Sequence, residues 1–268
     1  MLFRSRCNGS GSIPWERVRV DSAGNVYFVA RAEWANQTYI SSNDANFTPV
    51  YGPVNSFGEG VLAKINSSGI FQWVVQTGTI QQDGGRSGRV SSINDVAIDD
   101  ATGDVYMVGI MNGPGGQSYS GPAYCNLYSA GSTTVFKSFV PVGGGDCVVA
   151  KLNSSGVYQW ASNVSPTWSG ATIAYSSTNG VIVTGYYTNT TISIYNSSGT
   201  LYGTLPAGNS GASDVYVVKY SASTGTVTGS LKLTSAAANQ SYVPSSCALD
   251  SSGAYAYIAS TYTGGSGT

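Results

Sequence analysis

The stretch from Lys64 to Trp73, KINSSGIFQW, occurs again 87 residues later as KLNSSGVYQW, from Lys151 to Trp160. The two copies differ only by apolar or aromatic exchanges. A third, degraded copy without the tryptophan runs from Lys219 to Val227. Self-similarity at a regular separation is typical of repeat architectures, so we expect the chain to be built from copies of one structural unit.

A second motif precedes each copy of the first. It reads VDSAGNVYFVA from Val20, IDDATGDVYMVG from Ile98, AYSSTNGVIVTG from Ala174 and LDSSGAYAYIAS from Leu249. The first turn residues of these motifs, spaced 78, 76 and 75 residues apart, are Asp21, Asp99, Tyr175 and Asp250. The chain of 268 residues therefore holds about three and a half units. Residues 1–14 form an N-terminal lead. We place the units at 15–73, 74–160 and 161–232, followed by an incomplete unit at 233–268.

The local patterns predict strands throughout. Runs of β-branched and aromatic residues alternate with turns rich in Gly, Asn, Asp and Ser, and no stretch has the 3.6-residue apolar period of a helix. The runs Val26–Ala30, Val105–Gly109 and Val181–Gly185 are almost wholly apolar, which is typical of strands covered on both faces. The sequence thus predicts an all-β repeat domain over 15–268.

The motif order resembles the bacterial-type (SBBP-like) β-propeller repeat. That pattern runs Asp-x-x-Gly-Asn-Val-Tyr, an acidic strand entry, Lys-Leu-Asn-x-x-Gly and a terminal Trp, and it is matched well by the first two units, moderately by the third and over the opening half of the fourth. The resemblance implies four-stranded sheets stacked around an axis. Because its motifs are turn and core residues, it specifies the fold more than any activity.

Two features depart from that pattern. The units exceed the 40 to 50 residues of an ordinary propeller blade, so each carries an insertion that we interpret as extra strands or a long surface loop. The largest is Asn112–Gly145, and in the third unit Thr191–Leu205 reads as a hairpin with its own NSSG turn. Three and a half blades also cannot close a ring, which predicts closure by missing sequence or by a partner, with an open linear stack as the rival.

The composition limits the classes of partner. Charged residues make up 9% of the chain, with 12 basic and 13 acidic, so nothing indicates nucleic-acid binding. No apolar run approaches the ~18 residues of a membrane span. A surface rich in Gly, Ser and Tyr favours an extracellular, cell-surface or virion-surface protein, although the first residues lack the apolar core of a signal peptide. Leu2–Ser5 matches the translation of a sequencing adaptor, so we expect residues 1–5 to be an assembly artefact and the chain to be an internal fragment.

Covalent modification is predicted at two kinds of residue. Cys125 and Cys147 flank the largest insertion and form the favoured disulfide candidate, with two buried thiols as the alternative. Sequons, which either carry glycans or simply form turns, lie at Asn36, Asn46, Asn66, Asn153, Asn189, Asn196 and Asn239.

Few residues suggest chemistry. The chain has no histidine, which excludes Ser-His-Asp and Cys-His catalysis, and no motif points to a cofactor or a metal. The weak ligand candidates are Glu59, Asp146 and Asp214, which occupy equivalent positions at strand entries; they either stabilise the sheets or form a ring that binds a cation or a sugar. Asp99, Asp100 and Asp104 suggest calcium only superficially, because the loop lacks the spacing of an EF-hand. Trp73 and Trp160 are expected to pack between sheets, with ligand stacking as the alternative.

These observations favour a non-enzymatic, extracellular structural or adhesive protein that associates with itself or with other surface proteins, and that could form part of a fibre. The Tyr-rich Ser118–Ser132 has a composition suited to binding or to subunit contacts. The alternative, from a different class, is a carbohydrate-binding propeller with lyase or hydrolase activity, since a pair of carboxylates can hydrolyse glycosides.

Overall fold

The computed structural model describes residues 15–32, 38–40, 48–50, 59–81, 91–111, 123–132, 134–141, 145–167, 169–208, 212–234 and 241–263. These residues form antiparallel sheets and contain no helix, which confirms the prediction of an all-β fold. Each of their sheets is open. Within the same part of the chain there is also no helix long and apolar enough to cross a membrane.

Each of the first three units contributes four consecutive antiparallel neighbours to a sheet. The first unit forms β1 (Trp15–Val20), β2 (Val26–Ala32), β5 (Glu59–Ile65) and β6 (Phe71–Gln81). The second forms β7 (Ser91–Ile98), β8 (Val105–Met111), β11 (Asp146–Leu152) and β12 (Tyr158–Ser165). The third forms β13 (Ser169–Ser176), β14 (Gly180–Thr188), β17 (Ser213–Tyr220) and β18 (Val227–Leu233). The described residues of the fourth unit form β19 (Ser241–Leu249) and β20 (Ala256–Thr263).

The insertions of the second and third units form hairpins that extend the sheet of the preceding unit. In the second unit β9 (Ala123–Tyr128) and β10 (Val135–Phe139) follow β8, yet β9 pairs with β6 of the first unit along Gln76–Gln81. In the third unit the predicted hairpin is confirmed as β15 (Ile192–Tyr195) and β16 (Leu201–Leu205), and β15 pairs with β12 of the second unit. The first unit's hairpin, β3 (Thr38–Ile40) with β4 (Thr48–Val50), forms a separate two-stranded sheet. Neighbouring units are therefore joined by main-chain hydrogen bonds as well as by packing.

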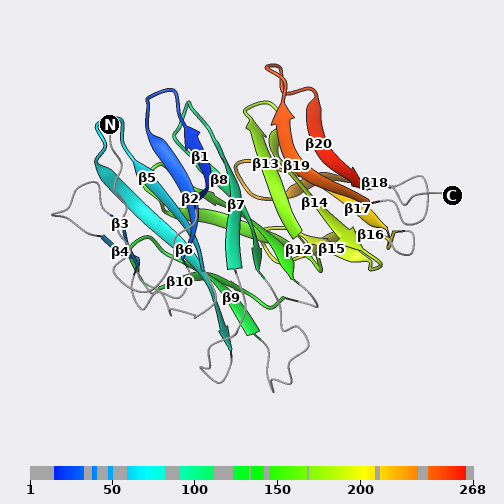
Figure 1. The fold of residues 1–268 in the computed structure, drawn as a ribbon. Coiled ribbons are helices and arrows are strands. Elements are labelled where there is room, and N and C mark those ends of the chain that lie inside the picture. The colour runs from blue at the N-terminus through cyan, green and yellow to red at the C-terminus, as the bar shows by residue number, and fades with distance from the viewer. Residues whose placement is uncertain are drawn as a thin grey trace.

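The hydrophobic core lies between successive sheets. One cluster joins the first two sheets and includes Tyr27, Leu62, Met107 and Leu127. A second joins the second and third sheets. Figure 1 shows the corresponding order, with β1, β2, β5 and β6 on one side, β13, β14 and β17 on the other, and β7 and β8 between them. The apolar strands are buried as predicted; every described side chain of β8, for example, is buried.

The repeated decapeptide supplies the contact between units. The indole N–H of Trp73 donates to the carbonyl oxygen of Ser154 at 3.0 Å, in the NSSG turn of the next unit. Gly156 of that turn has φ +78°, and a Cβ built on it would lie 2.7 Å from the indole ring. Trp160 repeats the arrangement, donating to Ala222 at 3.0 Å while Gly225 covers its ring. Both tryptophans are thus buried between sheets, as predicted.

We expect Gly156→Ala to destabilise the protein by about 3 kcal/mol, because a Cβ adds both left-handed backbone strain and a clash with Trp73. The matched control is Gly199→Ala: Gly199 has φ +85° in a turn of the same kind, but nothing lies within 4 Å of the added Cβ. That control should lose only about 1 kcal/mol. Urea unfolding followed by circular dichroism measures both, and equal losses would show that the Trp–Gly contact does not hold the units together.

Candidate functional site

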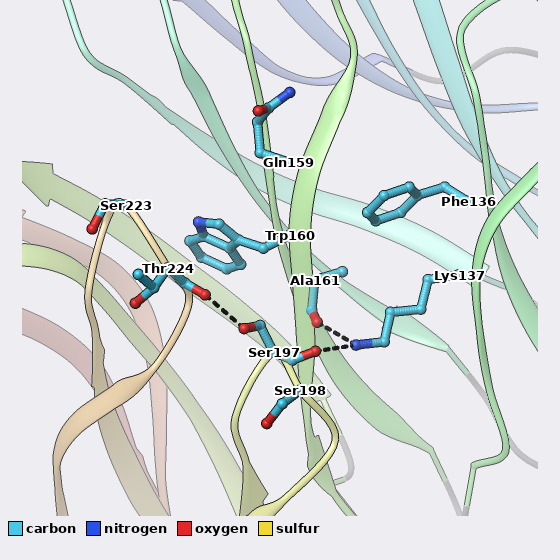
Figure 2. A pocket seen from close by; sticks show the side chains of 9 residues that line it. All are labelled: Phe136, Lys137, Gln159, Trp160, Ala161, Ser197, Ser198, Ser223 and Thr224. Atoms are coloured by element: carbon cyan, nitrogen blue, oxygen red, sulfur yellow. Dashed lines mark hydrogen bonds between the residues drawn. The ribbon is translucent and has the colours of Figure 1, made fainter.

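A side pocket with a volume of about 400 Å³ lies where four structural elements from two units meet. Its walls come from β10, β12, the β15–β16 turn and the β17–β18 turn. The lining residues are Phe136, Lys137, Gln159, Trp160, Ala161, Ser197, Ser198, Ser223 and Thr224. The pocket thus combines aromatic surface, one ammonium group and several hydroxyl groups (Figure 2).

Lys137 organises this pocket. Its ammonium group donates to the carbonyl oxygens of Ala161 at 2.6 Å and Ser197 at 2.7 Å, as Figure 2 shows. Burial lowers the pKa of the lysine. The Ser197 hydroxyl donates in turn to the carbonyl oxygen of Thr224 at 2.6 Å. Lys137 therefore connects the inserted hairpin of the second unit to the inserted hairpin of the third unit. The pocket requires both hairpins to be paired with their sheets.

Phe136 supplies the accessible aromatic surface. Its ring stacks on Tyr158 with centroids 5.0 Å apart and remains 38% exposed. Trp160 is only 5% exposed, since Gly225 covers its ring. A flat ligand or a sugar ring would therefore meet Phe136 rather than the tryptophan.

A second polar group lies among the first strands of the units. The Arg19 guanidinium on β1 is 2.7 Å from the Asp95 carboxylate on β7, whose side chain is 4% exposed. The other oxygen of Asp95 accepts from the amide of Ile173 on β13 at 3.5 Å. Burial raises the pKa of Asp95, although the Arg19 charge and the amide hydrogen bonds act in the opposite direction. Arg17 donates to the carbonyl oxygen of Ser245 on β19 at 3.4 Å, so the first strands of all four units approach one another.

The structure places the candidate carboxylates inside individual sheets. Asp146 is fully buried and accepts from Asn163 at 3.0 Å and from Ser165, both on the adjacent β12. Asp214 is fully buried as well, 3.0 Å from the ammonium group of Lys232 on β18. The side chain of Glu59 lies outside the described residues. The two described carboxylates are thus engaged by the fourth strand of their own unit, at a site distinct from the pocket.

The aspartates of the second unit's turn each have a different partner. Asp99 accepts from the Tyr175 hydroxyl at 2.8 Å, Asp100 accepts from the amide of Ser22 at 2.8 Å, and Asp104 is 2.7 Å from the Lys151 ammonium group. The first two contacts connect the second unit to the third and to the first, and the third lies within the second unit. Among the described residues, no group of three Asp, Glu or Cys side chains could hold a metal ion.

The predicted disulfide is not formed. Cys125 and Cys147 are both buried thiols. Cys125 on β9 faces the core between the first two sheets, whereas Cys147 on β11 faces the core between the second and third. The two side chains belong to different cores because β9 joins the preceding unit's sheet. Burial raises the pKa of Cys147 to about 12, so the thiol stays protonated near neutral pH.

The described sequon asparagines form turns. Asn66 and Asn153 each accept two amides of their own NSSG turn, and Asn196 accepts the amide of Val227 at 2.8 Å. Asn189 has φ +47°. Glycosylation at these positions stays a prediction. Asn36, Asn46 and Asn239 lie outside the described residues.

Lys137, Phe136 and Asp95 were not singled out from the sequence. Lys137 carried a usable signal, because it is the only charged residue in the insertion Asn112–Gly145. Asp95 is the only charged residue of β7, whose sequence is SSINDVAI, but nothing in that sequence identifies its partner. Phe136 carried none, since an aromatic residue in a predicted strand indicates packing.

The Asp99–Tyr175 hydrogen bond gives a pH-dependent prediction. Burial raises the pKa of Asp99, but hydrogen bonds from Tyr175 and the Ala101 amide leave it lowered from 3.8. A lowered folded-state pKa stabilises the protein above pH 3.8, and this stabilisation is lost as pH falls through the folded-state value. Tyr175→Phe should therefore lower the free energy of unfolding by about 1 kcal/mol near pH 7, and by progressively less below pH 3.8. The partial exposure of the carboxylate to solvent keeps this loss small.

Urea unfolding at several pH values measures this cost. Tyr202→Phe is the matched control, because Tyr202 is 44% exposed on β16. A Tyr175→Phe cost that is the same at pH 7 and below pH 3.8 would contradict the assignment of the hydrogen bond to the ionised carboxylate.

No protein-family model and no curated protein sequence matches this chain. The resemblance to propeller repeats therefore depends on the motifs themselves. The function has to be argued from the geometry of the sheets and of the side pocket.

Proposed function

We propose that this chain is a non-enzymatic structural or adhesive protein of an extracellular or particle surface, which associates with copies of itself or with other surface proteins through sheet edges. The observation that carries the proposal is the use of inserted hairpins within the chain. The edges of β6 and β12 are both covered by a hairpin of the following unit. Strand addition at an edge also joins separate chains, because it needs only an unpaired strand and a matching segment.

The described residues offer such an edge at β18. This strand is the last of its sheet, in the position that β6 and β12 occupy before their hairpins join. Leu231 and Leu233 on β18 are 48% and 44% exposed. With 9% charged residues and a net charge of −1, the chain has little electrostatic repulsion to oppose contact between copies. These features support assembly into a larger structure such as a fibre.

A propeller-like arrangement is part of the proposal. The four-stranded sheets would be blades, with β1, β7, β13 and β19 nearest the axis. The Arg19–Asp95 ion pair and the Arg17–Ser245 hydrogen bond support it, because they join first strands of different units. An open linear stack would instead leave β1 and β19 far apart.

The side pocket favours a second candidate, carbohydrate binding. Exposed Phe136 provides an apolar ring face, and Gln159, Ser198 and Ser223 provide hydrogen-bonding groups beside it. Apolar surface with a few polar groups is the usual composition of a small-molecule site. The described carboxylates Asp146 and Asp214 lie elsewhere and are engaged within their sheets, so the pocket supports binding and not hydrolysis.

Sedimentation velocity tests the assembly proposal. We expect concentration-dependent association of the chain, and we expect Leu231→Lys with Leu233→Lys to weaken it at least about tenfold, since charges on an edge strand oppose pairing. Val157→Lys is the control, because Val157 is 54% exposed in a turn away from that edge. A chain that stays monomeric at all concentrations would contradict self-association.

A glycan array tests the alternative. Binding that is lost in Phe136→Ala and retained in Tyr202→Ala is the result expected for carbohydrate recognition in the side pocket. Loss of binding in Asp146→Asn or Asp214→Asn with Phe136→Ala unaffected would instead point to the strand-entry carboxylates. No binding to any glycan would remove this candidate.

A further inference from the structure

The strand that carries the cation and the aromatic ring of the side pocket is locally distorted. Val135 and Lys137 of β10 pair with successive residues of β9, so Phe136 is an extra residue, as in a β-bulge. In a regular strand adjacent side chains point to opposite faces. Here Phe136 stacks on Tyr158 of β12, and Lys137 donates to Ala161 of the same strand. The bulge therefore lets both side chains line the pocket.

Lys137 brings a positive charge into the pocket without a carboxylate beside it. Among the lining residues it alone is charged. Within the part of the chain that the structure describes, its hydrogen bonds go only to the carbonyl oxygens of Ala161 and Ser197, and burial lowers its pKa with no carboxylate acting against this. By contrast, the ammonium nitrogen of Lys151 lies 2.7 Å from a carboxylate oxygen of Asp104. A partly buried charge without a counter-ion is unfavourable, so the site favours a bound anion.

The ammonium group of Lys137 keeps one donor for a ligand. An ammonium group has three N–H donors, and the two carbonyl oxygens take two of them. The third can donate a charge-assisted hydrogen bond to an anionic oxygen in the pocket. Such a bond is shorter and stronger than one between neutral groups, so it would distinguish an acidic ligand from a neutral one of the same shape.

The rest of the lining suits the ring of a sugar. Figure 2 shows Phe136 and Ser223 on opposite sides of the pocket. The hydroxyl of Ser198 bonds to that of Thr200 at 2.6 Å, and the hydroxyl of Ser223 bonds to that of Ser221 at 3.1 Å. Because a hydroxyl group has one donor and two acceptor positions, both serines retain capacity for the hydroxyl groups of a ligand. The volume of about 400 Å³ lies within the range of roughly 300–1,000 Å³ that small-molecule sites occupy.

We propose that the side pocket binds an acidic sugar, with its anionic group on the Lys137 ammonium and an apolar face of its ring on Phe136. Ser198, Ser223 and Gln159 supply hydrogen bonds to the hydroxyl groups of the ring. The anionic group is either the carboxylate of a uronic or sialic acid or the sulfate of a sulfated sugar. This inference rests on the carbohydrate-binding candidate and deepens it, because it names the class of sugar that the pocket recognises.

The class of sugar is tested with the full chain on a glycan array that presents uronic acids, sialic acids and sulfated sugars beside their neutral counterparts. We expect acidic glycans to bind at least about tenfold more tightly than the neutral ones, because only acidic glycans accept the charge-assisted hydrogen bond. A preference for carboxylated or for sulfated glycans identifies the anionic group. Calorimetric titration of the wild-type chain with the best acidic glycan and with its neutral counterpart, a methyl ester for a carboxylate, measures the difference.

Variants assign the binding to this pocket. Lys137→Met keeps the aliphatic stem and removes the charge, so the affinity for the acidic glycan should fall to that for its neutral counterpart. Phe136→Ala should weaken the binding of both glycans about tenfold. Val135→Ala is the matched control and should leave binding unchanged, because Val135 is 40% exposed on the same strand and is not part of the lining. Circular dichroism checks that each variant is folded.

Equal binding of acidic and neutral glycans to the wild-type chain would overturn this inference and leave the carbohydrate-binding candidate in place. That comparison needs no variant, so it decides the matter where Lys137→Met does not fold. Acidic glycans that bind Phe136→Ala or folded Lys137→Met as tightly as the wild-type chain would also overturn it, because their site would lie elsewhere. No binding to any glycan would remove both the inference and the candidate on which it rests.

Discussion

The contact between a tryptophan and the glycine turn of the next unit is the constraint on which the structure depends. Trp73 and Trp160 each donate a hydrogen bond to a carbonyl of that turn, while a glycine with positive φ lets the backbone approach the indole face. The contact requires the turn and the tryptophan together, which explains why one decapeptide carries both. The third copy has Gly229 at the strand position that the tryptophan occupies in the other two copies.

The inserted hairpins add a second kind of connection. β9 of the second unit pairs with the sheet of the first unit, and β15 of the third unit pairs with the sheet of the second. The sheets of the first and second units are therefore complete only when the following unit is folded beside them. Lys137 reinforces this order by bonding the second unit's hairpin to the third unit's turn. Opening one unit would expose strand edges and apolar surface in its neighbour, so we expect the units to unfold cooperatively. The same mode of connection suits a protein that builds larger structures from its own edges.

The sequence predicted the parts of the fold that are encoded locally. Turn residues and apolar runs identified the strands of every unit, and the NSSG turn within Thr191–Leu205 identified the β15–β16 hairpin. The position after the NSSG turn correctly placed both tryptophans between sheets. What the sequence did not predict is which sheet each inserted hairpin joins, because strand pairing across units depends on long-range contacts that have no local pattern. The disulfide hypothesis failed for this reason, since pairing of β9 with β6 directs Cys125 into a different core from Cys147. The side pocket was missed likewise, because its walls come from two units.

The most direct test of this account is a measurement of backbone nuclear Overhauser effects across β6 and β9 in solution. The account predicts cross-strand effects in the register that pairs Thr77 with Leu127 and Thr79 with Cys125. A β9–β10 hairpin that shows effects within itself, or to β8 of its own unit, but none to β6 would contradict the exchange of hairpins between units.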